Sequence, residues 1–294
     1  MSYGQKQSRS IPADKYHSYG NDFLVLIADQ VEESSFARFA RSICDPHTGV
    51  GADGCVFVNT GDPETVILRI FNRDGSEAGM SGNGSRCACA FLHHHQFARR
   101  PAVRMETLSG IKVYHLLHER EFLWIYRSEM GPPAFAAESI PFKAKNGAEI
   151  LDHALEVAGE KLTISALSVG NPQCVVFVDR PPQDDFFRRV GAALEIHPSF
   201  PERTNVSFAL VEGPDQLRIR IWERGVGPTH SSGTGSCGAA VAAIRAGRVQ
   251  APVKVYTETG MQEVDWSPGG QISLTGWAEF IGKIEYCWKE DVTH

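Results

Sequence analysis

The amino-acid sequence predicts an α+β protein made of two similar halves. Three observations lead to this prediction: short apolar runs outnumber helical stretches, three pairs of related segments recur at nearly one spacing, and each half has a glycine cluster that leads into an apolar helix. An excess of strands favours a mixed sheet over a regular alternation of strands and helices. We therefore expect two pseudo-symmetric α/β domains that arose by internal duplication.

Most expected elements are strands, predicted by apolar runs that turn residues bound. They cover residues 23–27, 56–58, 66–71, 103–105, 111–117 and 122–126 in the first half, and 163–167, 175–178, 206–211, 217–222 and 253–256 in the second, before a strand-rich C-terminal tail. Residues 1–12 are expected to form an unstructured leader. The pair Pro132-Pro133 predicts a break between the halves.

Four helices are expected, at residues 33–43, 86–92, 186–194 and 237–244. Apolar residues of the first recur at the spacing of one helix face; they are Phe36, Phe39, Ala40 and Ile43. The second and fourth helices follow the glycine clusters. The fourth is apolar on every side, which predicts a buried helix.

Three blocks of the first half recur in the same order in the second half. They are Ser18-Tyr-Gly-Asn21, Ile70-Phe-Asn-Arg73 and Ser81-Gly-Asn-Gly-Ser85, with the counterparts Ser168-Val-Gly-Asn171, Ile221-Trp-Glu-Arg224 and Ser232-Gly-Thr-Gly-Ser236. The spacing is 150 residues for the first pair and 151 for the others. Gly-x-Gly alone is common turn punctuation, but the ordered set indicates a duplicated domain.

Composition narrows the class of function. The chain of 294 residues has 29 basic and 35 acidic residues, a net charge of −6, and no long basic stripe, so no nucleic-acid partner is expected. No apolar run reaches membrane-spanning length, and the N-terminal residues lack the apolar core of a secretory signal. We expect a cytoplasmic protein without a membrane partner.

Neither a metal nor a disulfide framework is indicated. The 7 cysteines are scattered, odd in number and without paired C-x-x-C spacing. The run His93-His-His95 is expected to be a solvated helix end, because no Cys or His partner stands at ligand spacing.

One glycine-rich segment of the second half fits a dinucleotide-binding motif. Gly233-Thr-Gly-Ser-Cys-Gly238 fits G-x-G-x-x-G, and Glu258 follows the last glycine by 20 residues. The strand that should end at the first glycine is expected to end near Trp222, and without that strand the motif is weak evidence for a nicotinamide cofactor.

The two glycine clusters predict a carboxylate site. A helix begins with unpaired N–H groups and a partial positive charge, and glycine lets a ligand approach the backbone closely. One such helix start from each half is expected to converge on one carboxylate. Inverting an amino-acid α-carbon needs one group to remove the proton and another to return it on the opposite face. A carboxylate cradle would stabilise the charge that develops.

Ordered motifs along the chain resemble the diaminopimelate epimerase family. They are His17-Ser-Tyr-Gly-Asn-Asp-Phe23, Gly49-Val-Gly-Ala-Asp-Gly54, Phe71-Asn-Arg-Asp-Gly-Ser-Glu77, Ser81-Gly-Asn-Gly-Ser-Arg-Cys87, Gly170-Asn-Pro-Gln-Cys-Val175, Phe200-Pro-Glu-Arg-Thr-Asn205, Trp222-Glu-Arg-Gly225 and Ser232-Gly-Thr-Gly-Ser236. The resemblance runs from about residue 14 to the C-terminus.

The resemblance implies a cofactor-independent isomerase, which needs no pyridoxal phosphate and converts LL- to meso-diaminopimelate for lysine and peptidoglycan synthesis. It implies a sheet wrapped around a central helix in each domain. The expected domains are residues 13–128, completed by 278–294, and residues 129–277. The expected partners are an amino-acid substrate with two carboxylates and a second copy of the chain in a homodimer.

The resemblance also implies the site residues. The expected substrate contacts are Asn21, Asn72, Asn171, Asn205, Glu223 and Arg224, with backbone N–H groups of Gly82, Asn83, Gly233 and Thr234 on the reacting carboxylate. Arg224 would pair in bidentate fashion with the distal carboxylate.

The sequence departs from the family at the acid–base pair. Ser81 and Ser232 stand where the family has two cysteines, and Gln173 stands where it usually has a histidine. A serine hydroxyl is a much weaker acid than a thiol and needs a neighbouring base. The candidate catalytic residues are therefore Ser81, Ser232 and Glu223, which could serve Ser232. Cys87 and Cys237 lie several residues into the helices and are not expected to substitute.

Four hypotheses remain, in this order. The first is an epimerase of diaminopimelate or a related amino acid that uses the two serines. The second is another racemase or a dehydratase on the same scaffold with one competent base. The third is a catalytically impaired, amino-acid-binding protein, and the fourth is a nucleotide-binding oxidoreductase.

Overall fold

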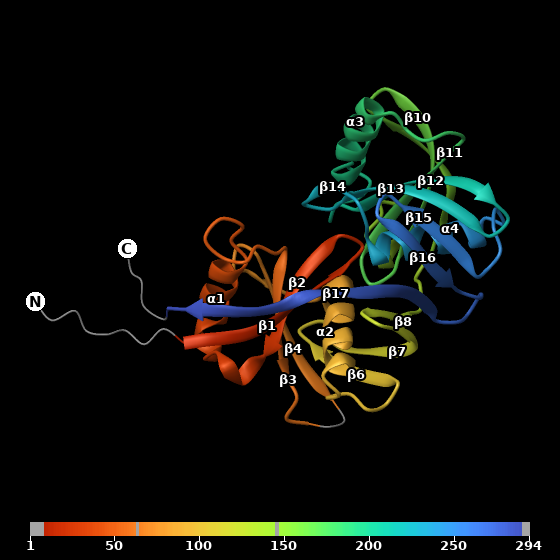
Figure 1. Ribbon diagram of the computed structural model, residues 1–294. Helices are drawn as coiled ribbons and strands as arrows, with labels where there is room; N and C mark the ends of the chain where they lie inside the picture. Colours follow the sequence, from red (N-terminus) through yellow and green to blue (C-terminus); the bar gives the residue numbers. More distant parts are fainter. Residues whose placement is uncertain (1–8, 63–64, 145–146, 290–294) are drawn as a thin grey trace, which may run out of the picture. The chain divides into compact units, whose positions relative to one another are not determined.

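The computed structural model describes residues 9–62, 65–144 and 147–289, which fall into two compact units (Figure 1). The first unit comprises Met1–Arg127 and Trp277–His294, and the second comprises Ser128–Gly276. The last strand, β17 (Ile272–Trp288), contributes residues to both units.

The first unit is a mixed sheet with two α-helices. Its elements are β1 (Arg9–Ser18), β2 (Asn21–Ile27), α1 (Phe36–Ile43), β3 (Gly54–Asn59), β4 (Val66–Asn72), β5 (Glu77–Ala78), α2 (Gly82–His94), β6 (Ala102–Thr107), β7 (Gly110–Arg120) and β8 (Leu123–Gly131), whose last residues belong to the second unit. Strands β2 and β3 are parallel, as are β4 and β6. The pairs β1–β2, β3–β4 and β6–β7 are antiparallel.

The second unit repeats this order. Its elements are β9 (Ile150–Val157), β10 (Glu160–Ser168), β11 (Pro172–Val178), α3 (Asp184–Glu195), β12 (Asn205–Gly213), β13 (Gln216–Glu223), β14 (Gly227–Thr229), α4 (Gly233–Arg245), β15 (Val253–Thr257) and β16 (Gly260–Asp265). Here β11–β12 and β13–β15 are parallel, and β10–β11, β12–β13 and β15–β16 are antiparallel. The recurring pattern of pairs confirms the predicted α+β class.

Each unit has one core on either face of its strands. In the first unit α2 packs on one face, with Val56 and Ile70, while α1 packs on the other, with Phe57 and Phe71. In the second unit α4 packs with Ile219 and Ile221, and α3 with Phe208. Figure 1 shows α2 beside β6, β7 and β8, and α4 beside β15 and β16. The prediction of a buried apolar helix after the second glycine cluster is confirmed, since α4 is buried from Gly235 to Ala243.

One local prediction is wrong and one strand is missed, each because of tertiary pairing. Residues 9–12 are not a leader: they begin β1, where Ile11 is buried opposite Tyr286 of β17. Only residues 1–8 of the expected leader lie outside the described part of the chain. Strand β9 was not predicted, because its sequence is mixed and mostly exposed; it is held by antiparallel pairing with β10. Strand β8 continues to Gly131, so the break at Pro132-Pro133 follows it directly.

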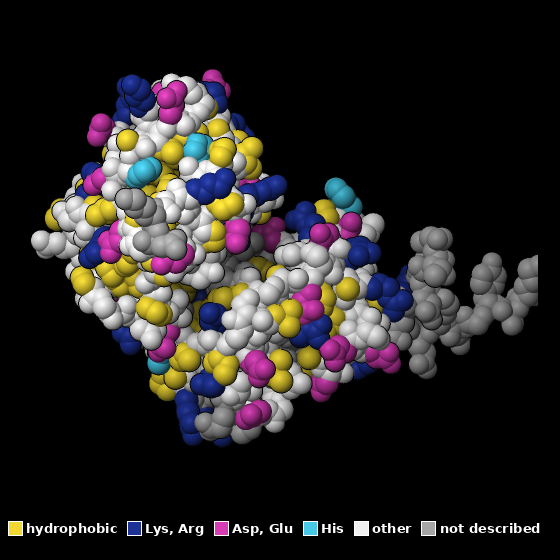
Figure 2. Space-filling view, turned by 180° about the vertical axis from the view of Figure 1, so that it is seen from behind, with side chains coloured by type: hydrophobic (Ala, Val, Ile, Leu, Met, Phe, Trp, Pro, Cys, Tyr) yellow, Lys and Arg dark blue, Asp and Glu magenta, His cyan; other side chains and the backbone are white. Residues whose placement is uncertain are grey.

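The surface carries charges of both signs. On the face drawn in Figure 2, basic and acidic side chains alternate without a continuous basic surface. Among the helices of the described residues, none combines the length and the apolar character that a membrane crossing requires.

Candidate functional site

The two glycine clusters form equivalent helix starts. Ser81 precedes α2 with extended backbone angles of φ −135° and ψ 119°, and Ser232 precedes α4 with φ −147° and ψ 125°. Each hydroxyl oxygen accepts a hydrogen bond from the N–H three residues on, at 3.1 Å from Gly84 and 3.2 Å from Gly235. These are N-cap bonds, a role in which serine is among the preferred residues. The helices therefore begin at the glycine clusters, four residues before the apolar runs at Arg86 and Cys237.

A side chain at the last glycine of each Gly-x-Gly would be crowded. A Cβ atom on Gly84 would lie 3.1 Å from Phe23, and one on Gly235 would lie 3.2 Å from the Cβ atom of Ser232 and 3.4 Å from Ile221. By contrast, a Cβ atom on Gly82 would meet nothing within 4 Å. The N–H groups of the first helical turn have no partner within the helix, and the helix dipole is positive there. Each unit thus offers one start that suits an anion.

In the first unit, hydrogen-bonded amides connect the helix start to the strands. The Nδ2 atom of Asn83 donates to Oδ1 of Asn21 at 3.3 Å, and Nδ2 of Asn21 donates to a carboxylate oxygen of Asp53 at 2.8 Å. On the other side, Oδ1 of Asn83 accepts from the guanidinium of Arg86. The structure therefore joins Asn21 and Asn83, two expected site residues, and adds Arg86 and Asp53.

In the second unit, the corresponding chain is neutral. Nε2 of Gln173 donates to Oδ1 of Asn171 at 2.7 Å, and Nδ2 of Asn171 lies 3.5 Å from Oγ1 of Thr234. The hydroxyls of Thr234 and Ser232 are 3.4 Å apart. Ser232 accepts from the N–H of Gly235, and in its contact with Thr234 either hydroxyl can be the donor.

Gln173 is held rigidly although half of its amide is unsatisfied. Its side chain is 1% exposed and its Oε1 atom has no hydrogen-bond partner among the described residues. It lies against α4 at Gly238, where a Cβ atom would come within 2.8 Å of both Cβ and Cγ of Gln173. Glycine at position 238 therefore makes the space that Gln173 occupies.

The strand ends beside the helix starts differ in charge. Side chains alternate along a strand, so Glu223 shares the face of Ile221, which packs in the core of α4 and lies close to Gly235. Its half-buried carboxyl has no ion-pair partner among the described residues, and burial raises its pKa above the ordinary value. The counterpart in the first unit is Asn72 at the end of β4, whose Nδ2 atom donates to Ser76 at 2.9 Å.

The remaining expected contacts, Arg224 and Asn205, lie at the ends of β13 and β12. Arg224 is exposed; its Nη1 atom donates to the carbonyl of Glu202 at 3.1 Å, and no carboxylate of the described residues pairs with it. Asn205 is buried, donates to the carbonyl of Pro172 at 2.9 Å and accepts from the backbone N–H of Arg224 at 3.0 Å. Both ends of the Asn205 amide are thus used within the protein, where they fix the strand end that carries Arg224.

The cysteines do not replace the missing thiols. Cys87 and Cys237 are fully buried in the cores around α2 and α4. Burial raises the pKa of the Cys87 thiol well above its ordinary value, which disfavours a thiolate. The prediction that these two do not substitute is consistent with their positions.

The run His93-His-His95 lies at the end of α2, as the sequence predicts; His93 and His94 are half-buried and His95 is exposed. His95 Nε2 lies 2.7 Å from a carboxylate oxygen of the buried Asp14, and His94 Nδ1 lies 2.8 Å from the hydroxyl of Tyr16. The donor atoms of Asp14, His94 and His95 all lie within 4.8 Å of one another. Asp14 comes from β1, remote in sequence, so ligand spacing could not reveal it. His95 is hydrogen-bonded directly to Asp14, and His94 is connected to Asp14 through the hydroxyl of Tyr16.

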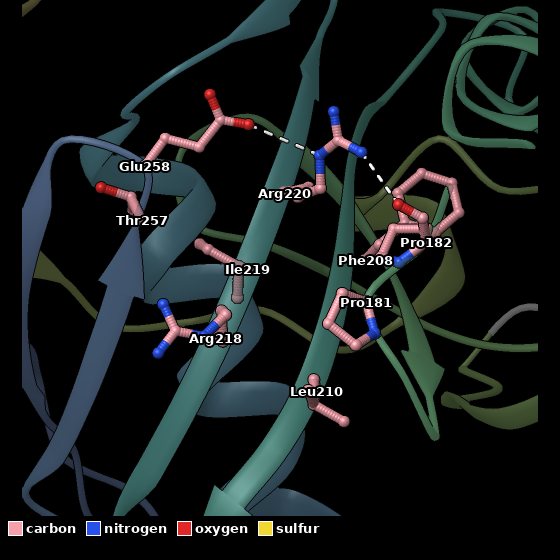
Figure 3. A pocket seen from close by; sticks show the side chains of 9 residues that line it. All are labelled: Pro181, Pro182, Phe208, Leu210, Arg218, Ile219, Arg220, Thr257 and Glu258. Atoms are coloured by element: carbon pink, nitrogen blue, oxygen red, sulfur yellow. Dashed lines mark hydrogen bonds and ion pairs between the residues drawn. The ribbon is translucent and has the colours of Figure 1, made fainter. Parts of the chain in front are cut away.

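A separate groove lies on the α3 side of β12 and β13, away from α4 (Figure 3). Arg220 crosses it, with Nη1 donating to the carbonyl of Pro182 at 2.9 Å and Nε 3.5 Å from Glu258. Glu258 also pairs with His230 at 2.6 Å. The acidic residue of the dinucleotide motif is therefore engaged in ion pairs, and β13 ends at Glu223, well before Gly233.

Comparison with known proteins decides the family. The model of the family described as diaminopimelate epimerase matches residues 14–136 and 165–281. This chain belongs to the diaminopimelate epimerase family. Diaminopimelate epimerase from Pelotomaculum thermopropionicum is 38% identical over 280 residues, which cover 94% of this chain and 98% of that protein. The enzyme of the same name from Moorella thermoacetica is 39% identical over 265 residues, 89% of this chain and 94% of the relative. Homologues so named are isomerases.

Solved structures of other proteins share the fold. A PhzF-family phenazine biosynthesis protein from Bacillus anthracis has a TM-score of 0.65 at 17% identity and covers 94% of this chain and 99% of that chain. A hydroxyproline epimerase from Agrobacterium vitis has a TM-score of 0.63 at 17% identity and covers 99% of this chain and 95% of that chain. At these identities the likeness establishes the fold.

Proposed function

We propose that this protein is a cofactor-independent amino-acid epimerase that converts LL- to meso-diaminopimelate by removing and returning the α-proton, in lysine and peptidoglycan synthesis. The observation that carries the proposal is the pair of equivalent helix starts at Ser81 and Ser232, one per unit, in a chain of this family.

The backbone N–H groups of the helix starts would hold the reacting carboxylate. Removing an α-proton shifts negative charge onto that carboxylate, and donors fixed beforehand stabilise the transition state most effectively. Gly82, Asn83, Gly233 and Thr234 would supply these donors, because each lies in the first turn of its helix.

Recognition of the distal end would rest on Arg224. Its exposed guanidinium has no carboxylate partner among the described residues, so it can take a substrate carboxylate in bidentate geometry. Asn205 would act by holding the backbone of Arg224. Asn21, Asn72 and Asn171 would distinguish the ammonium group from the carboxylate by the orientation of their amides.

The two units would contribute differently to proton transfer. Glu223 would accept the proton directly or through Ser232, whose hydroxyl is an N-cap beside the same strand end. Ser81 has no carboxyl at the corresponding strand end, where Asn72 stands. On this side the hydroxyl would return the proton as an acid and would be regenerated from solvent.

A second candidate function is a proton-transfer reaction that uses a single base, as in another racemase or a dehydratase. The absence of a carboxyl at position 72 of the first unit is the observation that favours it. In that case Glu223 would remove a proton from its substrate. A dehydratase would then release the leaving hydroxyl as water, whereas a one-base racemase would return the proton to the opposite face of the planar intermediate.

Proton exchange in D2O tests the proposal. The protein is incubated with LL-diaminopimelate, and loss of the α-proton is followed by NMR together with the stereochemistry of the recovered amino acid. The proposal expects deuterium in newly formed meso-diaminopimelate. Exchange without inversion would support the single-base alternative. Binding without any exchange would leave an amino-acid-binding protein and reject both enzymatic proposals.

A further inference from the structure

Arg86 carries a buried positive charge that no carboxylate of the described residues neutralises. Its side chain is 1% exposed, and its hydrogen bonds go to neutral groups, from Nε to the hydroxyl of Ser18 at 3.2 Å and from Nη2 to Oδ1 of Asn83. No carboxylate of the described residues forms an ion pair with it. The counterpart in the second unit is Cys237, so this charge exists in one unit only.

The position of Arg86 adds to the field of the helix start. It lies in the second turn of α2, directly behind the first turn at which the helix dipole is positive. Two positive sources without a counter-charge favour an anion at this start more strongly than the dipole alone. The start of α4 has only the dipole.

Arg86 also fixes the direction of the amides next to it. A guanidinium can only donate, so Asn83 must turn its oxygen towards Arg86 and its NH2 group towards Asn21. At the other end the carboxylate of Asp53 accepts a hydrogen bond from the NH2 group of Asn21, so the oxygen of Asn21 is turned towards Asn83. We call the sequence Arg86, Asn83, Asn21 and Asp53 the amide chain.

The amide chain leaves donors free. Each NH2 group uses one N–H within the chain, and its second N–H has no partner among the described residues. Both amides therefore present a donor, which suits a carboxylate and not an ammonium group. In the second unit neither end of the corresponding chain is charged, because it runs from Gln173 to Thr234, so its amides are not set in this way.

We propose that Arg86 is a positioning residue that, together with Asp53, orients Asn83 and Asn21 so that the first unit selects a carboxylate of the substrate. This inference rests on the proposed function, since it assigns the chemistry of one half of the same site. Arg86 acts through Asn83 and does not itself contact the substrate.

Binding measurements on four variants test the proposal. Isothermal titration with LL-diaminopimelate should give a Kd that rises about tenfold or more in Arg86→Gln and several-fold in Asp53→Asn. Each substitution removes one of the two charged groups that fix the orientation of the amides. Arg86→Lys should recover part of the affinity because it keeps the charge and one donor. In the double variant Arg86→Gln/Asp53→Asn the loss should be smaller than the product of the single losses, because both act on one chain.

Ser18→Ala is the matched control. It removes the other hydrogen-bond partner of Arg86 and leaves the amide chain intact, so the Kd should stay within about twofold of the unmodified protein. Asp53 is 44% exposed in its side chain, so Asp53→Asn is expected to fold even if Arg86→Gln does not. Unchanged affinity in Asp53→Asn, or losses that multiply in the double variant, would overturn the proposal.

A measurement without ligand separates this proposal from the proposed function. Exchange of the side-chain amide protons of Asn83 with solvent is followed by NMR, with Asn83→Asp to identify its signals. Asp53→Asn should speed that exchange, although Asp53 does not contact Asn83. Unchanged exchange would reject the amide chain, even if the enzyme epimerises diaminopimelate; faster exchange would support it, even if the enzyme does not.

Discussion

The two units have the same order of strands and the same capped helix start, yet they place different chemistry around it. The first unit surrounds Ser81 with a buried cation and oriented amides. The second surrounds Ser232 with a neutral chain and adds the unpaired carboxyl of Glu223. The two units keep the same backbone geometry, and we propose that their side chains have different roles, with the first unit holding negative charge and the second moving a proton.

The largest effect should come from removing the carboxyl of the second unit. Glu223→Gln should lower the rate of α-proton exchange by about 10²–10⁴-fold, the usual contribution of a general base. Exchange is measured in D2O with LL-diaminopimelate. Glu258→Gln is the matched control, because that carboxylate pairs with Arg220 and His230 and should not matter for exchange. Near-normal exchange in Glu223→Gln would contradict the claim that the second unit supplies the base.

The next effect concerns substrate recognition at the end of β13. Arg224→Met should weaken binding of LL-diaminopimelate by about 30-fold or more, a loss of at least about 2 kcal/mol for a charged partner. L-Lysine lacks the distal carboxylate, so its weaker binding should change little. Titration calorimetry with both ligands checks this. Equal losses for the two ligands would place Arg224 outside the distal contact.

Restoring thiols should reduce the difference between the units. A thiol has a pKa of about 8.5, and a helix N-terminus lowers it, so Ser81→Cys/Ser232→Cys should raise the exchange rate by about tenfold or more. Ser85→Cys, in the buried part of α2, is the control and should give no gain. If the double variant is no faster, the limit lies at Gln173 or in the substrate, and not in the acid–base pair.

Packing behind the second helix start gives a smaller effect, on stability. Gly238→Ala would place a Cβ atom 2.8 Å from Gln173, so we expect a loss of about 1–3 kcal/mol in the free energy of unfolding. Gln173→Ala in the same chain should relieve most of that loss. Chemical denaturation of the single and double variants measures the coupling. Additive losses would show that the two residues do not share this space.

The smallest effect is the pH dependence contributed by Glu223. Burial raises the pKa of this carboxyl above 4.5 in the folded state, so between 4.5 and the raised value the folded protein binds more protons than the unfolded chain. The contribution of Glu223 to stability is therefore greatest at low pH and falls as the pH rises through this window. The difference in unfolding free energy between the unmodified protein and Glu223→Gln, measured across pH, should change in that sense. A flat difference would indicate an ordinary carboxyl.

Much of this architecture can be predicted from the sequence because it depends on local patterns. Apolar runs locate most strands, the serine and glycines mark both helix starts, and the repeated blocks reveal the duplication. Contacts between residues that lie far apart in the sequence cannot be predicted in this way. Ile11 joins a strand through β17, and Asp14 meets His95 from another element. Arg86 is a charged residue within an apolar helix, and this contrast could have identified it from the sequence. Its connection to Asp53 through two amides could not be predicted without the structure.

Deuterium wash-in from each diaminopimelate isomer tests the central claim most directly. LL- and meso-diaminopimelate are incubated separately with the enzyme in D2O, and early deuterium in the recovered substrate is compared with deuterium in the product. Because Glu223 lies in one unit only, the account predicts that one isomer gains deuterium with retention faster than it inverts, while the other gains it mainly on inversion. Equal behaviour of the two isomers, or no exchange from either, would contradict it.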